Sequence, residues 1–275
     1  MDHGALMSFS DRIGITEPKS ILQVDSIDSD LRNGLWQACI EHYLRKYNDR
    51  YVLDSRFKSH MQNIYVNFFK LAGDKVPYGY DQGIAAVRRW FFEANWWDVY
   101  NFIEFLVSGG NIQFIGRVAF FLEREKSGYR IINKQFVPIT DPIEVAAVSE
   151  AALVGAAFAG TRQHMQTAIA LFSRKPEPDY RNSIKEAISA VESAARVVTG
   201  DSKATLGATL KKINAKMAIH PALRDAMNKL YGYTSDEGGI RHALLEESNI
   251  DEVEAKFMIV ACSAFVNFCV QRSGV

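Results

Sequence analysis

The sequence has few cysteines and no excess of charge of either sign, and both shortages exclude classes of protein. Only three of its 275 residues are cysteine, and none of the three has the spacing of a metal-binding motif. The 32 Lys and Arg residues are balanced by 32 Asp and Glu residues. The chain therefore lacks the basic footprint of a protein that coats nucleic acid, and any nucleic-acid ligand would have to meet a local patch.

The sequence also lacks the motifs of several enzyme classes. It has no phosphate-binding glycine loop of the P-loop or Rossmann type, which argues against an NTPase or a dehydrogenase. A Gly-x-Ser-x-Gly elbow is missing as well. No two histidines share a ligand spacing with an acid or a thiol, so we expect neither a bound metal nor a cofactor.

Long uninterrupted apolar runs are absent too. The most apolar segments, residues 90–107 and 258–270, are broken by Glu93, Asp98 and Glu104 or are too short to span a bilayer. The N-terminus is polar and carries acids early, unlike a signal peptide. An odd number of cysteines fits a reducing compartment. We therefore expect a soluble cytoplasmic protein that makes no membrane contact.

What the sequence does contain is helical periodicity. Asp28-Ser29-Asp30 is typical of the start of a helix. A further helix is predicted over about residues 55–71. In the first of these helices the apolar residues recur every four positions, as in a buried stripe: Leu31, Leu35, Cys39 and Tyr43.

Glycines and a proline predict a break before the most aromatic part of the chain. The aromatic segment, residues 90–105, is interpreted as the centre of a helical core, because aromatic side chains dominate core energetics. The alternative is an exposed groove for a partner, since large apolar surface patches usually mark a contact. The residues that predict the break are Gly73, Pro77, Gly79 and Gly83.

A short hairpin is predicted next, followed by an Ala-rich helix. Residues 129–132 and 136–138 flank the turn pair Asn133-Lys134. Asp141 is predicted to cap the following helix, with Pro142 at its first position and Glu144 completing a capping box. We expect this helix to continue to about Phe172, before the prolines of the 174–179 segment end it.

The remaining residues predict four more helices. The first is ended by Gly200, the second is a basic helix over about residues 206–217, and the third runs from Pro221 to about Tyr231. The predicted buried stripe of the first is Ile184, Ile188, Val191, Ala195 and Val198. That of the last is Val253, Phe257, Val260, Ala264 and Phe268.

These patterns predict a mainly α fold of two domains. Residues 1–140 would form a helical N-terminal domain with one small β-hairpin, and residues 141–275 a helical C-terminal domain. The Ala-rich helix could belong to either side of this boundary.

The N-terminal half resembles the AbiJ-type N-terminal domains of bacterial abortive-infection proteins. The resemblance lies in the opening residues 9–15, the aromatic segment 90–105 and residues 122–140, from Leu122-Glu123-Arg124-Glu125 to Pro138-Ile139-Thr140. It covers about half of the chain. It implies a regulatory or sensory role for this domain rather than a chemistry of its own.

The C-terminal half resembles HEPN domains of the abortive-infection C-terminal kind. The resemblance lies in residues 184–196, Thr205-Leu206-Gly207 and Gly238-Gly239-Ile240-Arg241-His242. It implies a four-helix bundle that forms a homodimer, and a metal-independent RNase whose Arg and His act in a cleft shared by two protomers. In the usual HEPN motif several residues separate the Arg from the His, whereas Arg241 and His242 are adjacent.

The chemistry of RNA cleavage assigns roles to these residues. His242 would act as base or acid, since an unperturbed imidazole titrates at about 6.5. Arg241 would bind the phosphate through its guanidinium fork, and Glu192 would assist from the first helix of the domain. The residues predicted to bind RNA are Asn182, Lys185, Arg196, Lys211 and Lys212.

A structural interpretation of the same residues stays open. Thr234 and Glu237 form a capping box, and Arg241 could pair with Glu237 one turn away. Glu192 could pair with Arg196 in the same way. Adjacent helical residues point about 100° apart, so Arg241 and His242 need a dimer partner to act on one phosphate.

Two functions follow from these alternatives. The first is an anti-phage abortive-infection effector that cleaves or binds RNA, such as tRNA, once an unknown phage or host trigger activates it. The second is a non-catalytic HEPN-like module that senses or regulates another defence component. Growth arrest on expression in bacteria would favour the first.

Overall fold

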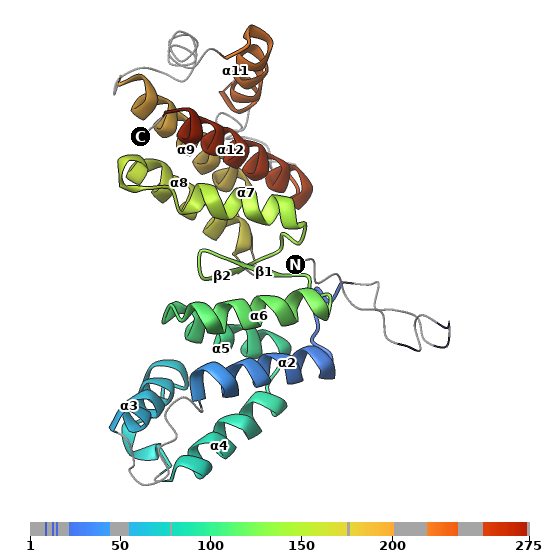
Figure 1. Cartoon of the computed structure of the whole chain (residues 1–275), viewed down its shortest axis with the longest axis vertical. Helices are drawn as coiled ribbons and strands as arrows, with labels where there is room; N and C mark the ends of the chain where they lie inside the picture. Colours follow the sequence, from blue (N-terminus) through green and yellow to red (C-terminus); the bar gives the residue numbers. More distant parts are fainter. Residues whose placement is uncertain are drawn as a thin grey trace. The chain divides into compact units, whose positions relative to one another are not determined.

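The computed structural model describes Phe9, Ile13, Ile15 and residues 22–44, 55–77, 79–174, 177–200, 219–235 and 250–273. The chain divides into two compact units, Met1–Phe136 and Val137–Val275, and each is described by itself (Figure 1). The described residues are mainly helical with one small two-stranded sheet, so the predicted fold class is confirmed.

The first unit is built from helices (Figure 1), which pack around an aromatic core. A π-helical turn, Ile40–Leu44, follows α2, and another, Ile64–Phe68, follows α3. A 3-10 turn at Gly73–Lys75 comes before α4. The helices are α2 (Ser29–Cys39), α3 (Ser55–Asn63), α4 (Tyr80–Glu93), α5 (Trp96–Ser108) and α6 (Ile112–Arg124).

Local sequence signals explain how this unit starts. The Asp28 side chain accepts a hydrogen bond from the Leu31 amide and caps α2 as predicted. Of the predicted stripe, Leu31, Leu35 and Cys39 are fully buried, whereas Tyr43 is half-buried. The stripe therefore holds along α2 and loosens in the π-helical turn that follows.

The aromatic segment lies in the core, which confirms that interpretation over the exposed groove. Phe91 and Phe102 are fully buried. The ring of Phe68 packs against Trp90 and Phe102, with centroids 5.2 and 5.0 Å apart. Trp97 is the exception, because it remains half exposed near the start of α5.

The expected break at Gly83 is wrong. This glycine lies inside α4, where an added Cβ would come 3.2 Å from the Met61 side chain of α3. Gly83 therefore serves the close packing of two helices rather than a turn.

The hairpin is confirmed. Strands β1 (Arg130–Ile132) and β2 (Gln135–Val137) pair across Asn133 and Lys134, whose φ angles are 49° and 64°. Two consecutive left-handed residues are the requirement of a type I′ turn, which matches the twist of the strands it joins.

The second unit is a bundle of α7 (Pro142–Ala152), α8 (Ala159–Ser173), α9 (Tyr180–Thr199) and α12 (Glu252–Ser273), with α11 (Pro221–Ser235) as a further helix (Figure 1). As predicted, Asp141 caps α7 by accepting hydrogen bonds from the amides of Ile143 and Glu144. Two further predicted ends are confirmed, since α8 stops before the proline-containing segment and α9 stops at Gly200.

The single Ala-rich helix expected to reach Phe172 is wrong, because α7 and α8 are separate helices bent by 88°. A 3-10 turn at Ala156–Phe158 joins them after Gly155. Gly155 weakens the helix at this point. The turn also inserts Val154 and Phe158 into the core, where both are buried.

The predicted register of the last helix is also wrong. In α12, Val253 and Phe257 are 70% and 58% exposed, while Met258 and Ile259 are buried. The helix is apolar on both sides, so periodicity alone cannot choose the side that faces the bundle. The full set of buried α12 residues is Ala255, Met258, Ile259, Cys262, Ser263, Phe265, Val266, Asn267 and Cys269.

By length and composition alone, α12 could cross a membrane, and so could α7 and α8 if the bent pair were one span. Half of the apolar window of α12 is buried inside the structure. The core helix of a soluble protein has the same composition.

Candidate functional site

The residues predicted to bind and cleave RNA fall into two groups. Arg241, His242, Lys211 and Lys212 lie outside the described residues. The other four, Asn182, Lys185, Glu192 and Arg196, all lie on α9. Helix α9 is therefore where the structure bears on the predicted site.

The local sequence explains how α9 forms and which way it faces. Asp179 accepts a hydrogen bond from the Asn182 amide at its start, and Gly200 ends it with a φ of 72°. Ile184 and Val191 belong to a buried side that packs against α8 and α12. The predicted site residues occupy the opposite side of the helix and are exposed or half-buried.

Glu192 and Arg196 are brought together. Arg196 Nη2 lies 3.7 Å from Glu192 Oε2, as the i,i+4 spacing predicts. The Glu192 side chain is mostly covered, at 16% exposure, whereas that of Arg196 is more open. Both residues make further interactions. The acid and the cation of the predicted site are thus neighbours one helical turn apart.

Asn182 and Lys185 are held differently. The Asn182 side chain donates to Asp179 Oδ2 at 2.8 Å and so belongs to the cap of α9. Lys185 is exposed, and its carbonyl accepts a hydrogen bond from Ser189 Oγ. Of these two, Lys185 keeps its side chain on the open side of the helix.

A second polar pair, which sequence reasoning missed, joins α8 to α9. His164 Nδ1 and Glu186 Oε2 lie 2.7 Å apart. The turn between the helices sets this pairing, because the Asp179 amide donates to the Leu171 carbonyl. His164 lies seven residues before Leu171 and Glu186 seven after Asp179, so an antiparallel pairing brings them opposite one another.

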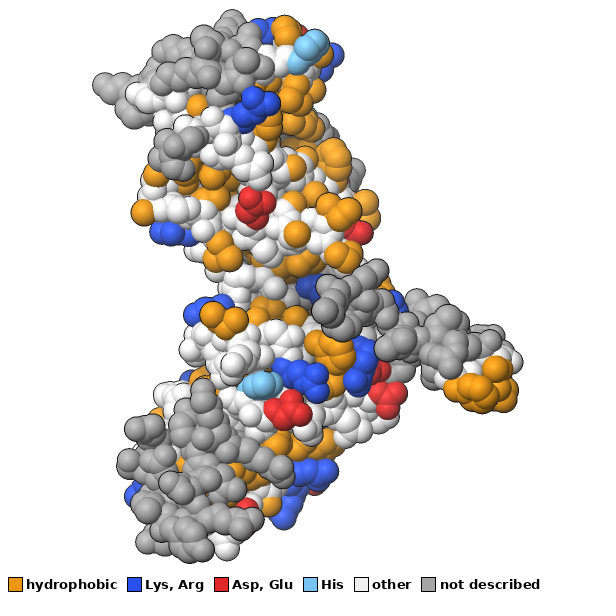
Figure 2. Space-filling model, in the orientation of Figure 1, with side chains coloured by type: hydrophobic (Ala, Val, Ile, Leu, Met, Phe, Trp, Pro, Cys, Tyr) orange, Lys and Arg blue, Asp and Glu red, His pale blue; other side chains and the backbone are white. Residues whose placement is uncertain are grey.

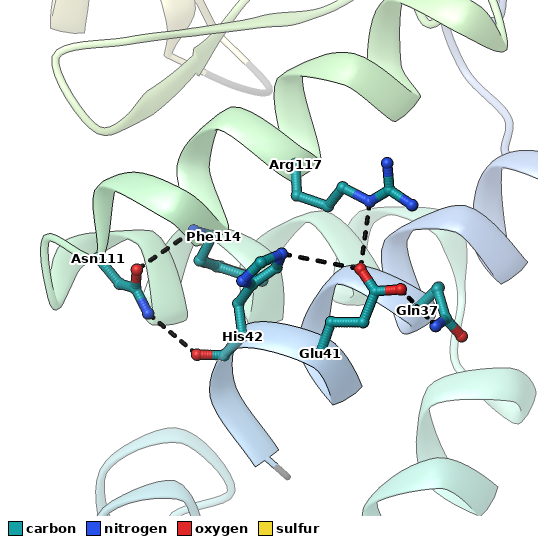
Figure 3. A network of polar contacts seen from close by, with 6 residues as sticks. All are labelled: Gln37, Glu41, His42, Asn111, Phe114 and Arg117. Atoms are coloured by element: carbon teal, nitrogen blue, oxygen red, sulfur yellow. Dashed lines mark hydrogen bonds and ion pairs between the residues drawn. The ribbon is translucent and has the colours of Figure 1, made fainter. Parts of the chain in front are cut away.

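The first unit carries a polar network of its own (Figure 3). Glu41 accepts hydrogen bonds from Gln37 Nε2 at 2.6 Å and from Arg117 Nε at 3.2 Å. The bond from Gln37, followed by the charges of Arg117 and His42, lowers the pKa of Glu41. Asn111 Nδ2 donates to the His42 carbonyl at 2.9 Å. The network ties the π-helical turn after α2 to α6, which makes it structural.

The charges on the described surface are mixed. On the face drawn in Figure 2, Lys and Arg side chains are scattered among Asp and Glu over both units, without a large area of one sign. Among the residues that the structure describes, no three His, Cys, Asp or Glu side chains are grouped to hold a metal ion. The described part of the candidate site is therefore a local arrangement on α9 and its flank.

Comparison with known families gives a match to the N-terminal half of the chain. Residues 7–154, more than half of the chain, match the family described as AbiJ N-terminal domain 4. The chain belongs to this family. Searches of curated proteins and of solved structures each gave no match. The AbiJ domain includes the hairpin and α7, and membership of the family indicates a role in abortive infection.

Proposed function

We propose that this AbiJ-family protein is an anti-phage effector of the cytoplasm whose C-terminal unit is a HEPN-like RNase. The family supplies the defence context. The observation that supports a reaction on RNA is the open side of α9, which presents the exposed Lys185 and, two turns further on, Arg196 beside the mostly covered carboxylate of Glu192. Cations for phosphate oxygens beside an acid are the groups that phosphodiester cleavage uses.

The proposed mechanism is a metal-independent transesterification. A base takes the proton of the RNA 2′-hydroxyl, the 2′-oxygen attacks phosphorus, and His242 protonates the 5′-oxygen as its bond to phosphorus breaks. Arg241 stabilises the charge on the phosphate oxygens. Glu192 assists through its position beside Arg196. Lys185, Lys211 and Lys212, with Asn182 and Arg196, hold the RNA backbone.

The proposal includes a homodimer formed through the C-terminal unit, since adjacent Arg241 and His242 need a second protomer to complete one site. The outward stripe of α12 supports this. A helix that is apolar on both sides needs a partner on each, and Val253 and Phe257 are still exposed. Hydrophobic side chains gather over the part of the second unit where α7 and α12 lie (Figure 2).

A second candidate function is a non-catalytic interaction module that regulates another defence component. Its support is that the α9 side chains already have local roles. Asn182 belongs to the cap of the helix, and Glu192 pairs with Arg196 within one turn. The outward apolar residues of α12 would then bind a different protein rather than a second copy.

Expression in bacteria separates the two functions. An overproduced RNase that is active without its trigger would arrest growth. Arg241→Ala and His242→Ala variants of equal solubility would not. An interaction module would leave growth unchanged in all three strains. Growth arrest that persists in both variants would contradict the assigned roles of Arg241 and His242.

A further inference from the structure

We propose that His164 and Glu186 form an acid–base dyad that takes part in RNA cleavage on the open side of α9. This inference rests on the proposed RNase function and adds to it a base from α8. The two side chains meet at 2.7 Å between two consecutive helices, and each remains partly exposed, at 41% and 28%. They are covered enough to be held and open enough to meet a ligand.

The protonation pattern of the dyad follows from its hydrogen bond. An ionised carboxylate only accepts, so Nδ1 of His164 carries the hydrogen that Glu186 receives. In a neutral imidazole the other nitrogen, Nε2, then has the lone pair. A carboxylate that holds one imidazole nitrogen leaves the other ready to take a proton, as in hydrolase triads.

The helices that carry the dyad are held in register around it. Ser183 Oγ donates to the Ala168 carbonyl at 2.8 Å in the buried interface of α8 and α9. Further along the same interface, a Cβ added to Gly160 would come 2.9 Å from Ser193 Oγ. These contacts lie on either side of His164 along α8, so the ring is positioned by the bundle rather than by a loop.

The other histidines of the described residues are held in different ways. His42 Nε2 is 3.7 Å from Glu41, too far for a hydrogen bond. The ring of His60 packs on Tyr43 with centroids 4.1 Å apart. His220 Nδ1 accepts from the Ala222 amide at the start of α11. His42 is thus a matched control, since it has a neighbouring carboxylate without the hydrogen bond that fixes the ring.

The position of the dyad fits the proposed reaction. Glu186 follows the exposed Lys185 on α9 and faces α8 through its bond to His164, so the dyad lies at the edge of the outer side of α9. A phosphate bound by Lys185 would bring an adjacent ribose to this side of the helix. His164 Nε2 would then take the 2′-hydroxyl proton as the oxygen–phosphorus bond forms and the bond to the 5′-oxygen breaks. The acid of the proposed mechanism protonates the 5′-oxygen, and the imidazolium of His164 returns its proton to water, which leaves a 2′,3′-cyclic phosphate and a free 5′-hydroxyl.

The test is single-turnover cleavage of tRNA by the purified full chain in EDTA. The variants are His164→Ala, His164→Gln, Glu186→Gln and the control His42→Gln. We expect both His164 variants to lose at least about 100-fold in rate, the usual contribution of a general base. Glu186→Gln should lose less, because the ring remains. Added imidazole should restore part of the rate of His164→Ala, which a structural role for His164 would not allow.

The outcomes separate this inference from the function on which it rests. If the unmodified protein cleaves tRNA and His164→Ala, with an unchanged melting temperature, cleaves within twofold of it, the dyad is overturned and the RNase stands. The dyad is also overturned if His164→Ala is slow and imidazole does not restore its rate, while His164→Gln cleaves as fast as the unmodified protein. If the unmodified protein leaves tRNA intact, even in extracts of growth-arrested expressing cells, both proposals fail together.

Discussion

Gly34 of α2 lies directly against the ring of Phe121 of α6. A Cβ added to Gly34 would come 2.5 Å from Phe121 Cδ1, closer than real Cβ contacts, so two helices of the first unit cross at a point where only a glycine fits. Phe121 is itself buried, with the guanidinium of Arg117 4.6 Å from its ring centre. The ring has little room to move away.

This contact predicts opposite effects for two glycine substitutions. Gly34→Ala should destabilise the first unit by about 1–3 kcal/mol through overpacking, although alanine favours helices. Gly116→Ala in α6 is the control, since nothing lies within 4 Å of its added Cβ, and it should stabilise by about 0.5–1 kcal/mol. Urea unfolding of the two variants measures both. Equal stability of the two would show that the helices do not cross this closely.

His60 predicts a dependence of stability on pH. Burial lowers the pKa of His60 from 6.5 to about 4. The unfolded chain therefore binds this proton at a higher pH than the folded chain. The free energy of unfolding is therefore not reduced by His60 above about pH 6.5. It falls as the pH is lowered towards 4, by up to about 3 kcal/mol, because the unfolded chain takes up the proton first.

The variant His60→Gln isolates the contribution of His60 to the pH dependence of stability. The difference in unfolding free energy between the unmodified chain and the variant should shrink as the pH is lowered from 7 to 5, because only the unmodified chain loses this term. A difference that stays constant over that range would show that His60 titrates normally in the folded protein.

Gln23 predicts a measurable loss from a single polar truncation. Its Nε2 donates to the Glu125 carbonyl and its Oε1 accepts from the Asp28 amide, both at 2.7 Å. Its backbone also pairs with Lys126 and Gly128. Gln23→Ala removes the two side-chain bonds and should cost about 1–3 kcal/mol.

Gln113→Ala, an exposed glutamine on α6, is the comparison and should change stability by less than about 0.5 kcal/mol. Hydrogen exchange at the Gly128 amide, which donates to the Gln23 carbonyl, should become faster only in the Gln23 variant. Unchanged exchange and stability would mean that this segment does not fasten the end of α6.

Because α12 has a buried and an exposed side, substitutions of two neighbouring residues should have different effects. Met258 is buried and Phe257 is exposed. Met258→Ser should destabilise the second unit by about 2–5 kcal/mol. Phe257→Ser should leave the fold intact and weaken the proposed dimer. Light scattering after gel filtration gives the mass of each variant and thermal melting its stability. A Phe257→Ser chain that unfolds would place the buried side where the periodicity first predicted it.

The sequence predicts best those features that depend on neighbouring residues. Asp28 and Asp141 each cap a helix by bonding amides two or three positions ahead, and the left-handed Gly200 ends α9. Each depends on a few adjacent residues, so a short stretch of sequence carries the full signal.

Features that depend on distant contacts are not predicted in this way. The apolar residues of α12 fit two stripes, and only packing against α7 and α9 selects the buried one. The pairing of His164 with Glu186 depends on the antiparallel register of α8 and α9. The sequence showed both residues as ordinary polar positions. Of the candidate site, it predicted the Glu192–Arg196 neighbourhood through its one-turn spacing and missed the pair between helices.

The most direct test of the proposed function is incubation of the purified full chain with total tRNA in EDTA, beside its His242→Ala variant. An RNase of the proposed kind gives discrete fragments that end in 2′,3′-cyclic phosphate, and only with the unmodified protein. Intact tRNA with both proteins, from cells whose growth the unmodified chain does not arrest, would contradict it and favour the interaction module.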